Sequence, residues 1–233
     1  RPKTGQAALD AMVQFRVAFL TDYQNAAYAD QYRSFVDRVR AAEAALGAGD
    51  ALPLSEAVAR YLFKLMAYKD EYEVARLQSD PGFAAHIQAQ FEGDFKVNCH
   101  LAPPLFAKRN AQGELQKQQF GAWMGQALRL LARCKFLRGT AFDVFGRSEE
   151  RRTERALIGE YRAAIEAMLP TLTAANRAAA AAFARVPEQI RGFGHVKARH
   201  LEAARLQWSL LLGKYDQPKA GQDVPMSVRQ GLE

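Results

Sequence analysis

The chain has 233 residues, of which 49% are hydrophobic, 24% charged and 10% aromatic, a composition typical of a globular protein with a sizeable core. Its 32 lysines and arginines exceed its 25 aspartates and glutamates, and the net charge of +7 favours anionic partners. With only two cysteines, Cys99 and Cys134, the chain cannot form a disulfide scaffold or, by itself, a four-cysteine zinc or iron–sulfur site. This low cysteine content indicates a reducing environment, so we expect a cytoplasmic protein. No apolar run reaches the length of a membrane span and no signal-peptide pattern occurs, so we expect neither membrane contact nor secretion. The first residue is Arg1 rather than methionine, from which we expect a fragment of a longer protein.

Most of the chain shows the apolar spacing of three and four residues that is typical of amphipathic helices. In chain order we predict helices over 9–20, 28–46, 56–77 and 81–91 and then, after an interruption, over 120–131, 157–168, 173–185 and 195–212. Ser55 is the predicted N-cap of the third helix. The expected fold class is mainly α, a helical bundle-like domain.

The middle of the chain interrupts this helical pattern. Residues 95–100 alternate between apolar and polar in the manner of a strand, and residues 115–120 can pair with them. We therefore predict a small β-hairpin inserted near residues 94–120 of a single helical domain that spans 1–213. Residues 214–233 are polar and contain two prolines, which predicts a loosely ordered C-terminal tail.

The sequence lacks the common patterns of catalytic and cofactor sites. It contains no phosphate-binding loop, dinucleotide-binding glycine pattern, zinc-protease motif, serine nucleophile elbow or paired-cysteine motif. Its four histidines have no metal-binding spacing with carboxylates. We predict no catalytic residue, no cofactor-binding residue and no metal ligand in this chain.

One polar cluster interrupts an apolar helix face. On a helical wheel, Lys69, Glu73 and Arg76 continue the stripe begun by valine and leucine residues over 58–65. A partly buried ion network that fixes helix contacts explains this pattern, and a polar pocket facing an anionic ligand or a neighbouring domain is the alternative. We predict that these side chains are buried together, with Asp94, His100 and Tyr72 as further members of the network.

Two basic regions are candidates for surface contacts. Arginines and glutamates alternate over 147–155, which predicts a solvated, self-paired helix face. The turn over 191–197 places glycines and an aromatic residue before a helix, a tight interhelical turn with the capacity to hold an anion. We predict a basic docking surface formed by Lys108, Arg109, Lys117, Arg191, His195 and Lys197.

Four segments resemble, in the expected order, the C-terminal region of the long, fused indolepyruvate ferredoxin oxidoreductases of bacteria. They are Lys64-Leu-Met-Ala-Tyr-Lys-Asp-Glu-Tyr-Glu-Val-Ala-Arg-Leu77, Gly93-Asp-Phe-Lys-Val-Asn-Cys-His-Leu-Ala-Pro-Pro-Leu105, Leu137-Arg-Gly-Thr-Ala-Phe-Asp143 and Pro187-Glu-Gln-Ile-Arg-Gly-Phe-Gly-His-Val-Lys197. We refer to them as motifs 1 to 4. The corresponding domain of those enzymes has no assigned role of its own.

The resemblance implies the reaction of a full-length parent enzyme. Such enzymes oxidatively decarboxylate aryl-pyruvates to the acyl-CoA and pass electrons to ferredoxin, using thiamine diphosphate, Mg²⁺ and [4Fe–4S] clusters. No Gly-Asp-Gly run for the diphosphate occurs here, and the two cysteines are isolated. We therefore expect the cofactors to lie elsewhere in the parent and this fragment alone to be inactive.

Two functions of different classes follow for the fragment. In the first it is a non-catalytic domain that packs on the catalytic domains of the same polypeptide, with ferredoxin or CoA as a partner of its basic surface. In the second it is an independent basic helical module that binds nucleic acid, for which the sequence offers no recognised motif. We favour the first.

Overall fold

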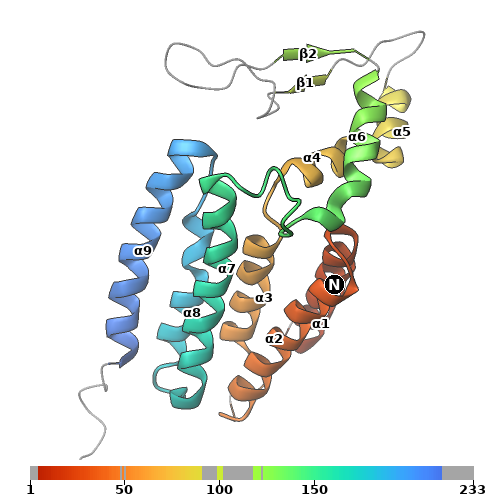
Figure 1. Ribbon diagram of the computed structural model, residues 1–233. Helices are drawn as coiled ribbons and strands as arrows, with labels where there is room; N and C mark the ends of the chain where they lie inside the picture. Colours follow the sequence, from red (N-terminus) through yellow and green to blue (C-terminus); the bar gives the residue numbers. More distant parts are fainter. Residues whose placement is uncertain are drawn as a thin grey trace, which may run out of the picture. The chain divides into compact units, whose positions relative to one another are not determined.

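The computed structural model describes residues 5–47, 49, 51–90, 99–101, 118–121 and 123–216 (Figure 1). Its α-helices are α1 (Gln6–Tyr23), α2 (Ala26–Ala44), α3 (Pro53–Met66), α4 (Glu71–Gln78), α5 (Pro81–Gln90), α6 (Trp123–Arg133), α7 (Glu149–Met168), α8 (Arg177–Arg185) and α9 (Gly194–Asp216). Short 3₁₀ helices are η1 (Cys134–Leu137), η2 (Leu169–Thr171) and η3 (Val186–Gln189), and the strands are β1 (Cys99–Leu101) and β2 (Gln118–Phe120). The mainly α fold class predicted from the apolar spacing is confirmed.

The chain folds into two compact units, each assembled from separate stretches. Unit 1 consists of Arg1–Gln14, Tyr32–Lys64 and Glu160–Glu233, and unit 2 of Phe15–Gln31 and Leu65–Gly159. The sequence pattern, which predicts one domain over 1–213, gives no sign of this division because the boundaries fall inside helices α1, α2, α3 and α7.

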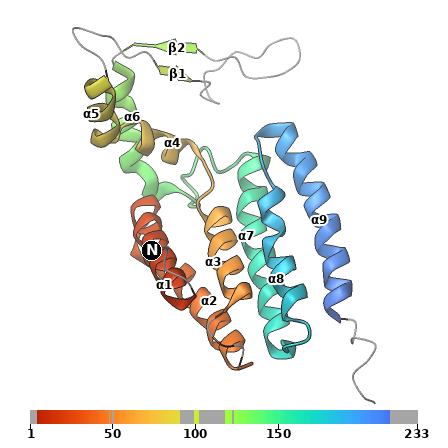
Figure 2. The same cartoon turned by 180° about the vertical axis from the view of Figure 1, so that it is seen from behind.

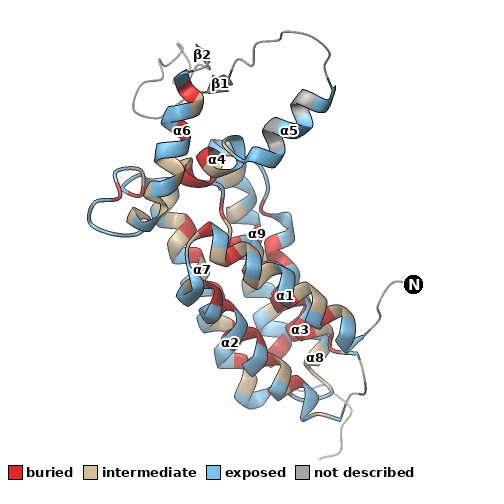
Figure 3. Cartoon of the chain, turned by 90° about the vertical axis from the view of Figure 1, so that its right-hand side faces the viewer, coloured by how far each residue is buried: buried red, intermediate tan, exposed pale blue. Residues whose placement is uncertain are grey.

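The core of unit 1 is formed by the apolar faces of its helices, and its buried tyrosines donate hydrogen bonds to backbone carbonyls. Tyr32 donates to the carbonyl of Ala59 (2.8 Å) and Tyr161 to that of Ala184 (3.0 Å). α8 lies beside α9 (Figures 1 and 2). Figure 3 shows the resulting alternation of buried and exposed residues along single helices. The fully buried side chains of this unit include Tyr32, Phe35, Val36, Val39, Leu54, Leu62, Tyr161, Ile165 and Met168.

A buried carboxylate caps one helix of unit 1. Glu43 of α2 has no exposed surface, and it accepts hydrogen bonds from the backbone N–H groups of Leu54 (2.9 Å) and Ser55 (2.7 Å). The Ser55 hydroxyl also donates to Glu43, at 2.7 Å. The prediction that Ser55 is the N-cap of this helix is wrong, because α3 begins at Pro53 and the carboxylate of Glu43 takes the place of a capping side chain.

The core of unit 2 is rich in tyrosine. The ring of Tyr23 is fully buried and stacks on Tyr28, with centroids 6.1 Å apart, and its hydroxyl donates to the carbonyl of Tyr68 (2.9 Å). α4 packs against α6, where Met124 and Leu128 of α6 meet Ala75 of α4. The spacing of the apolar residues on α6 therefore buries one face of the helix, as the sequence predicts.

The predicted helix over 56–77 is broken in two. α3 ends at Met66 and α4 begins at Glu71, with Asp70 as its N-cap. The side chain of Asp70 accepts the backbone N–H of Glu73 at 2.8 Å. This hydrogen bond competes with helix continuation, since an aspartate that caps its own backbone starts a new helix rather than extending the old one.

The described part of 94–120 consists of β1 and β2, which pair antiparallel. Cys99 faces Phe120, His100 faces Gln119 and Leu101 faces Gln118. The connection, residues 102–117, lies outside the described residues, so the hairpin as a whole stays a prediction. α9 continues through Asp216, beyond the predicted start of the tail at 214, and residues 217–233 also lie outside. Among the described residues, no helix has both the length and the apolar character that a membrane span requires.

Candidate functional site

Unit 2 contains a loop, residues 138–148, that the buried carboxylate of Asp143 holds in shape. The backbone N–H of Gly139 donates to Asp143 Oδ2 (2.8 Å) and that of Gly146 to Oδ1 (2.9 Å), while the hydroxyl of Tyr72 donates to Oδ1 (3.2 Å). Gly139 has φ +77°, and a Cβ on Gly146 would lie 2.2 Å from Asp143 Oδ2. Glycine is therefore the residue that fits at both positions.

The guanidinium of Arg138 is the second buried anchor of this loop. Its Nε lies 2.5 Å from Asp70 Oδ2 and its Nη2 2.9 Å from Asp70 Oδ1, a bidentate pair. Its Nη1 donates to the carbonyl of Tyr23 and to Gln24 Oε1, each at 2.7 Å. Burial alone would lower the pKa of Arg138, but the hydrogen bonds to Asp70 and the neighbouring Tyr23 raise it by more, so the pKa lies above its ordinary value.

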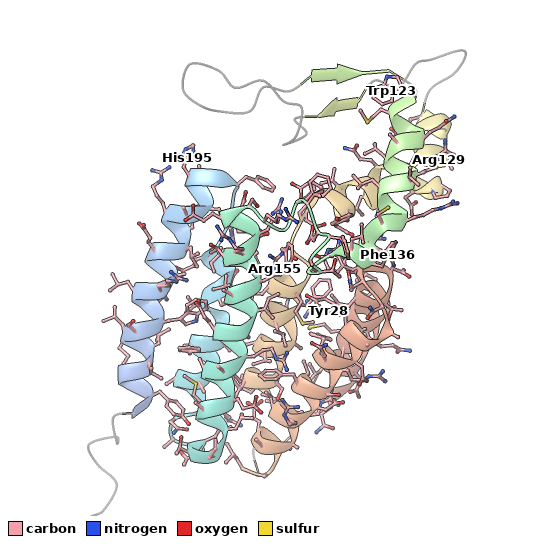
Figure 4. The ribbon with its side chains drawn as sticks, viewed as in Figure 1. Tyr28, Trp123, Arg129, Phe136, Arg155 and His195 are labelled. Atoms are coloured by element: carbon pink, nitrogen blue, oxygen red, sulfur yellow. The ribbon has the colours of Figure 1, made fainter. Side chains whose placement is uncertain are left out.

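A second largely buried cation in this unit is Arg151 of α7. Its side chain is 12% exposed and binds Glu71 of α4 (3.3 Å) and Glu154 (2.7 Å). The prediction of a solvated, self-paired face is wrong at this position, because Arg151 reaches a carboxylate of another helix and Glu154 is buried. Arg155 (labelled in Figure 4) donates to the carbonyl of Gly146 at 2.5 Å, which ties α7 to the loop.

Of the predicted polar network, the pair of Glu73 and Arg76 is present. Arg76 Nε donates to Glu73 Oε2 and its Nη2 to Oε1, both at 2.8 Å. The Glu73 side chain is 4% exposed and that of Arg76 24%. The guanidinium of Arg76 also lies over the ring of Phe19, 5.0 Å from its centroid.

The remaining members of that network are placed differently. Lys69 is exposed, because it lies in the break between α3 and α4 rather than on a continuous helix face. Tyr72 is buried but bonds to Asp143 instead of Glu73. Asp94 lies outside the described residues, and of His100 only the backbone, in β1, is described.

The buried polar residues of unit 2 form a cluster that stabilises its structure, and we call this cluster the brace. Its members are Asp70, Tyr72, Glu73, Arg76, Arg138 and Asp143. Both oxygens of Asp70, Asp143 and Glu73 accept hydrogen bonds from the protein itself. Burial and the neighbouring Asp143 raise the pKa of Tyr72, which keeps its hydroxyl protonated as a donor. Sequence reasoning did not single out Asp70, Arg138 or Asp143, although all three stand in motif 1 or motif 3.

Unit 1 contains a second polar cluster, where motif 4 meets the end of α3. Lys64 Nζ donates to the carbonyls of Pro187 (2.8 Å) and Glu188 (3.1 Å), and the hydroxyl of Tyr61 donates to Glu188 Oε2 (2.7 Å). Burial, then the positive charges of Arg191 and Lys197, lower the pKa of Lys64. The carboxylate of Glu188 opposes this effect, and it also lies 3.8 Å from Arg191.

The turn that follows η3 presents the basic residues of motif 4. Gly192 (φ +86°) and Gly194 (φ +53°) allow the chain to reverse before α9, and the ring Nδ1 of His200 is 2.8 Å from the carbonyl of Arg191. Arg191 and Phe193 are each 70% exposed. His195, labelled in Figure 4, is exposed and Lys197 is half-buried.

The predicted docking surface is therefore described in part. Arg191, His195 and Lys197 lie together at the start of α9, whereas Lys108, Arg109 and Lys117 lie outside the described residues. Among the residues that are described, no group of three histidine, cysteine, aspartate or glutamate side chains could hold a metal ion.

Comparison with known families gives one match. A family model described as "Family of unknown function (DUF6537)" matches residues 9–210. No curated protein and no solved structure matches the chain. The match covers motifs 1 to 4 and both polar clusters.

Proposed function

The chain belongs to the DUF6537 family, and from this premise we propose that it is the non-catalytic C-terminal domain of an indolepyruvate (2-oxoacid) ferredoxin oxidoreductase. In this role it packs on the catalytic domains of the same polypeptide and shapes the access of an anionic partner, ferredoxin or CoA. The parent oxidatively decarboxylates aryl-pyruvates to the acyl-CoA.

The observation that supports this role is that polar residues of the motifs form hydrogen bonds with one another. Asp70 and Tyr72 of motif 1 bond to Arg138 and Asp143 of motif 3, and Lys64 of motif 1 bonds to the start of motif 4. Polar side chains that satisfy one another in this way stabilise a shape, whereas a catalytic site leaves groups directed at a substrate. The motifs thus favour a structural and docking role.

The residues of this chain do not fit the cofactors of the parent. The sequence has no Gly-Asp-Gly run for a magnesium diphosphate, and two cysteines cannot ligate a four-cysteine cluster. Thiamine diphosphate, Mg²⁺ and the [4Fe–4S] clusters are accordingly assigned to other parts of the polypeptide, and no reaction step is assigned to this chain.

The basic surface supplies the anionic partner's site in this proposal. The proposal is supported by the effect of Arg191 and Lys197 on Lys64, whose pKa both cations lower although the carboxylate of Glu188 opposes them. Such a face raises the association rate of an acidic electron carrier at low salt. Lys108, Arg109 and Lys117 are the further residues that we propose for the docking of this partner.

The test is charge reversal in the full-length polypeptide. One variant combines Arg191→Glu with Lys197→Glu, and a second combines Lys108→Glu, Arg109→Glu and Lys117→Glu. Each variant is expected to raise the apparent KM for ferredoxin or for CoA, and this increase should shrink as salt is added. Lys214→Glu is the matched control, since Lys214 is exposed on the same helix about 25 Å from Lys197 along the axis.

Three outcomes contradict the proposal. A full-length polypeptide without 2-oxo acid oxidation would remove the parent reaction, and unchanged kinetics at low ionic strength would remove the docking role. A steep, salt-dependent affinity of the chain for DNA would instead support the nucleic-acid module.

A further inference from the structure

The loop of unit 2 that Asp143 holds in shape presents large apolar side chains to solvent. Phe142 is 77% exposed, Val144 53% and Phe136, in the adjoining η1, 66%. Phe136 is labelled in Figure 4. Phe145 of the same loop turns inward, its ring 5.4 Å from that of Tyr72 in an edge-on contact. Large exposed apolar groups that gather in nine residues of chain mark an interaction surface more often than scattered ones do.

The exposure does not come from a lack of structure in the loop. Asp143 accepts the backbone N–H groups of Gly139 and Gly146. In the same loop, Arg147 Nη2 donates to the carbonyl of Ala141 at 3.1 Å. A loop that is fixed before binding loses little conformational entropy when a partner covers it, so its apolar residues can contribute most of their burial energy to association.

The chain segment that carries the apolar residues has an excess of positive charge. Residues 133–147 contain four cations, of which Arg133 and Arg147 are exposed, and a single carboxylate, Asp143, which is buried. The contact of Arg147 with Ala141 places its charge next to Phe142. Exposed acidic residues begin at Glu149 and Glu150, in the first turn of α7, where the helix N-terminus favours negative charge.

We infer that Phe136, Phe142 and Val144 form a docking surface for a protein face with an apolar centre and a rim of carboxylates. An aromatic centre with a cationic rim is the arrangement expected of an interface anchor, and the positive rim selects an acidic partner. This inference rests on the proposed function, which makes the catalytic domains of the same polypeptide the owner of that face.

Hydroxyl-radical footprinting tests the inference in the chain alone and in the full-length polypeptide. Labelling of Phe136 and Phe142 is expected to fall about fivefold or more in the full-length polypeptide, as for residues at the centre of an interface. Phe15, equally large and 70% exposed on α1, is the matched control and keeps its labelling. Phe142→Ser is expected to lower the melting temperature of the full-length polypeptide but not that of the chain alone, and Phe15→Ser to change neither.

The outcomes separate this inference from the proposed function. If Phe142 stays labelled while other residues of the chain become protected, the domain packs by another face and the inference is wrong, although the proposed function stands. If no residue becomes protected, or the polypeptide lacks 2-oxo acid oxidation, the proposed function fails as well. Protection of Phe142 that rises with the concentration of the chain alone, or that appears with phosphatidylglycerol vesicles, assigns the surface to a second copy or to a membrane and overturns the inference.

Discussion

The two units bury carboxylates in different ways. In unit 1, Glu43 sits at the start of α3 and accepts backbone N–H groups and a hydroxyl. In unit 2, Asp70 binds the guanidinium of Arg138, and Asp143 combines backbone donors with Tyr72. The bonds of Glu43 connect neighbouring stretches of chain, α2 and α3, whereas unit 2 adds bonds between residues far apart in sequence, from Asp70 to Arg138 and from Tyr72 to Asp143. Unit 1 uses the start of a helix for its buried carboxylate, and unit 2 uses a charged pair for one of its distant connections.

The largest effect is expected from breaking the charged pair. Arg138→Ala leaves the carboxylate of Asp70 buried without its cation, and it is expected to lower the free energy of unfolding by about 4 kcal/mol. Urea denaturation measures the loss. Arg138→Lys retains the charge but not the bidentate geometry and is expected to recover only part of it. A loss below about 1 kcal/mol for Arg138→Ala would show that the pair is not a brace.

Glu43 gives the corresponding test in unit 1. Glu43→Ala leaves two backbone N–H groups and a hydroxyl without their acceptor, and we expect a loss of about 3 kcal/mol by the same measurement. Glu43→Gln keeps one carbonyl acceptor and should lose less. If glutamine were as harmful as alanine, the charge rather than the hydrogen bonds would hold α3 in place.

Gly146→Ala probes the shape of the loop without changing any charge. The added Cβ would lie 2.2 Å from Asp143 Oδ2, so the carboxylate must move, at a cost of about 2 kcal/mol. Gly159→Ala is the matched control, because a Cβ at that position of α7 meets nothing within 4 Å. The control should be neutral or stabilising by up to about 1 kcal/mol. Equal effects at both positions would contradict the fixed loop.

Alkaline pH tests the buried tyrosines of both units. Burial raises the pKa of Tyr23 in unit 2 and of Tyr161 in unit 1 above the ordinary value. The folded state therefore disfavours the tyrosinate, and the stability that each group contributes is complete below pH about 10 and lost as the pH rises further. Each should contribute a slope of about −1.4 kcal/mol per pH unit above pH 10. Phenylalanine at either position should remove one such slope; an unchanged slope would contradict the burial.

The smallest loss of stability is expected from the pair of Glu73 and Arg76, because Arg76 is partly exposed. Glu73→Ala removes the partner of Arg76, whose side chain is 24% exposed and can turn to water. We expect a loss of about 1 kcal/mol, less than for a pair with both charges buried. A loss near that of Arg138→Ala would mean that Arg76 is held as firmly as Arg138.

Local pattern predicts the helices of this chain better than it predicts the site. The apolar spacing indicates α2 and α6 nearly as they occur, because each of these helices buries one face. The same spacing predicts α3 and α4 as one helix. A helical wheel assumes a continuous helix, whereas Asp70 caps a new one. The charged stripe predicts burial correctly for Glu73 and Arg76, which lie within α4. It fails for Lys69, which lies in the break between α3 and α4 and is exposed.

The buried brace could not be derived from spacing. Asp70 and Arg138 stand 68 residues apart, and Asp70 lies between two charged residues, Lys69 and Glu71, that give no sign of burial. Glu43 was missed for a related reason, since a glutamate among alanines resembles an exposed helix position. In contrast, the basic turn at Arg191 and Lys197 was found from sequence, because its glycines and its cations are neighbours in the chain.

A double-mutant cycle on Asp70 and Arg138 tests most directly whether motif 1 and motif 3 are joined to build a structure. The free energy of unfolding is measured for Asp70→Asn, Arg138→Gln, the double variant and the unchanged chain. A coupling of about 3 kcal/mol is predicted for a buried bidentate pair. A coupling below about 0.5 kcal/mol, the range of independent sites, would contradict this structural role. Both residues would then be candidates for a catalytic or binding role.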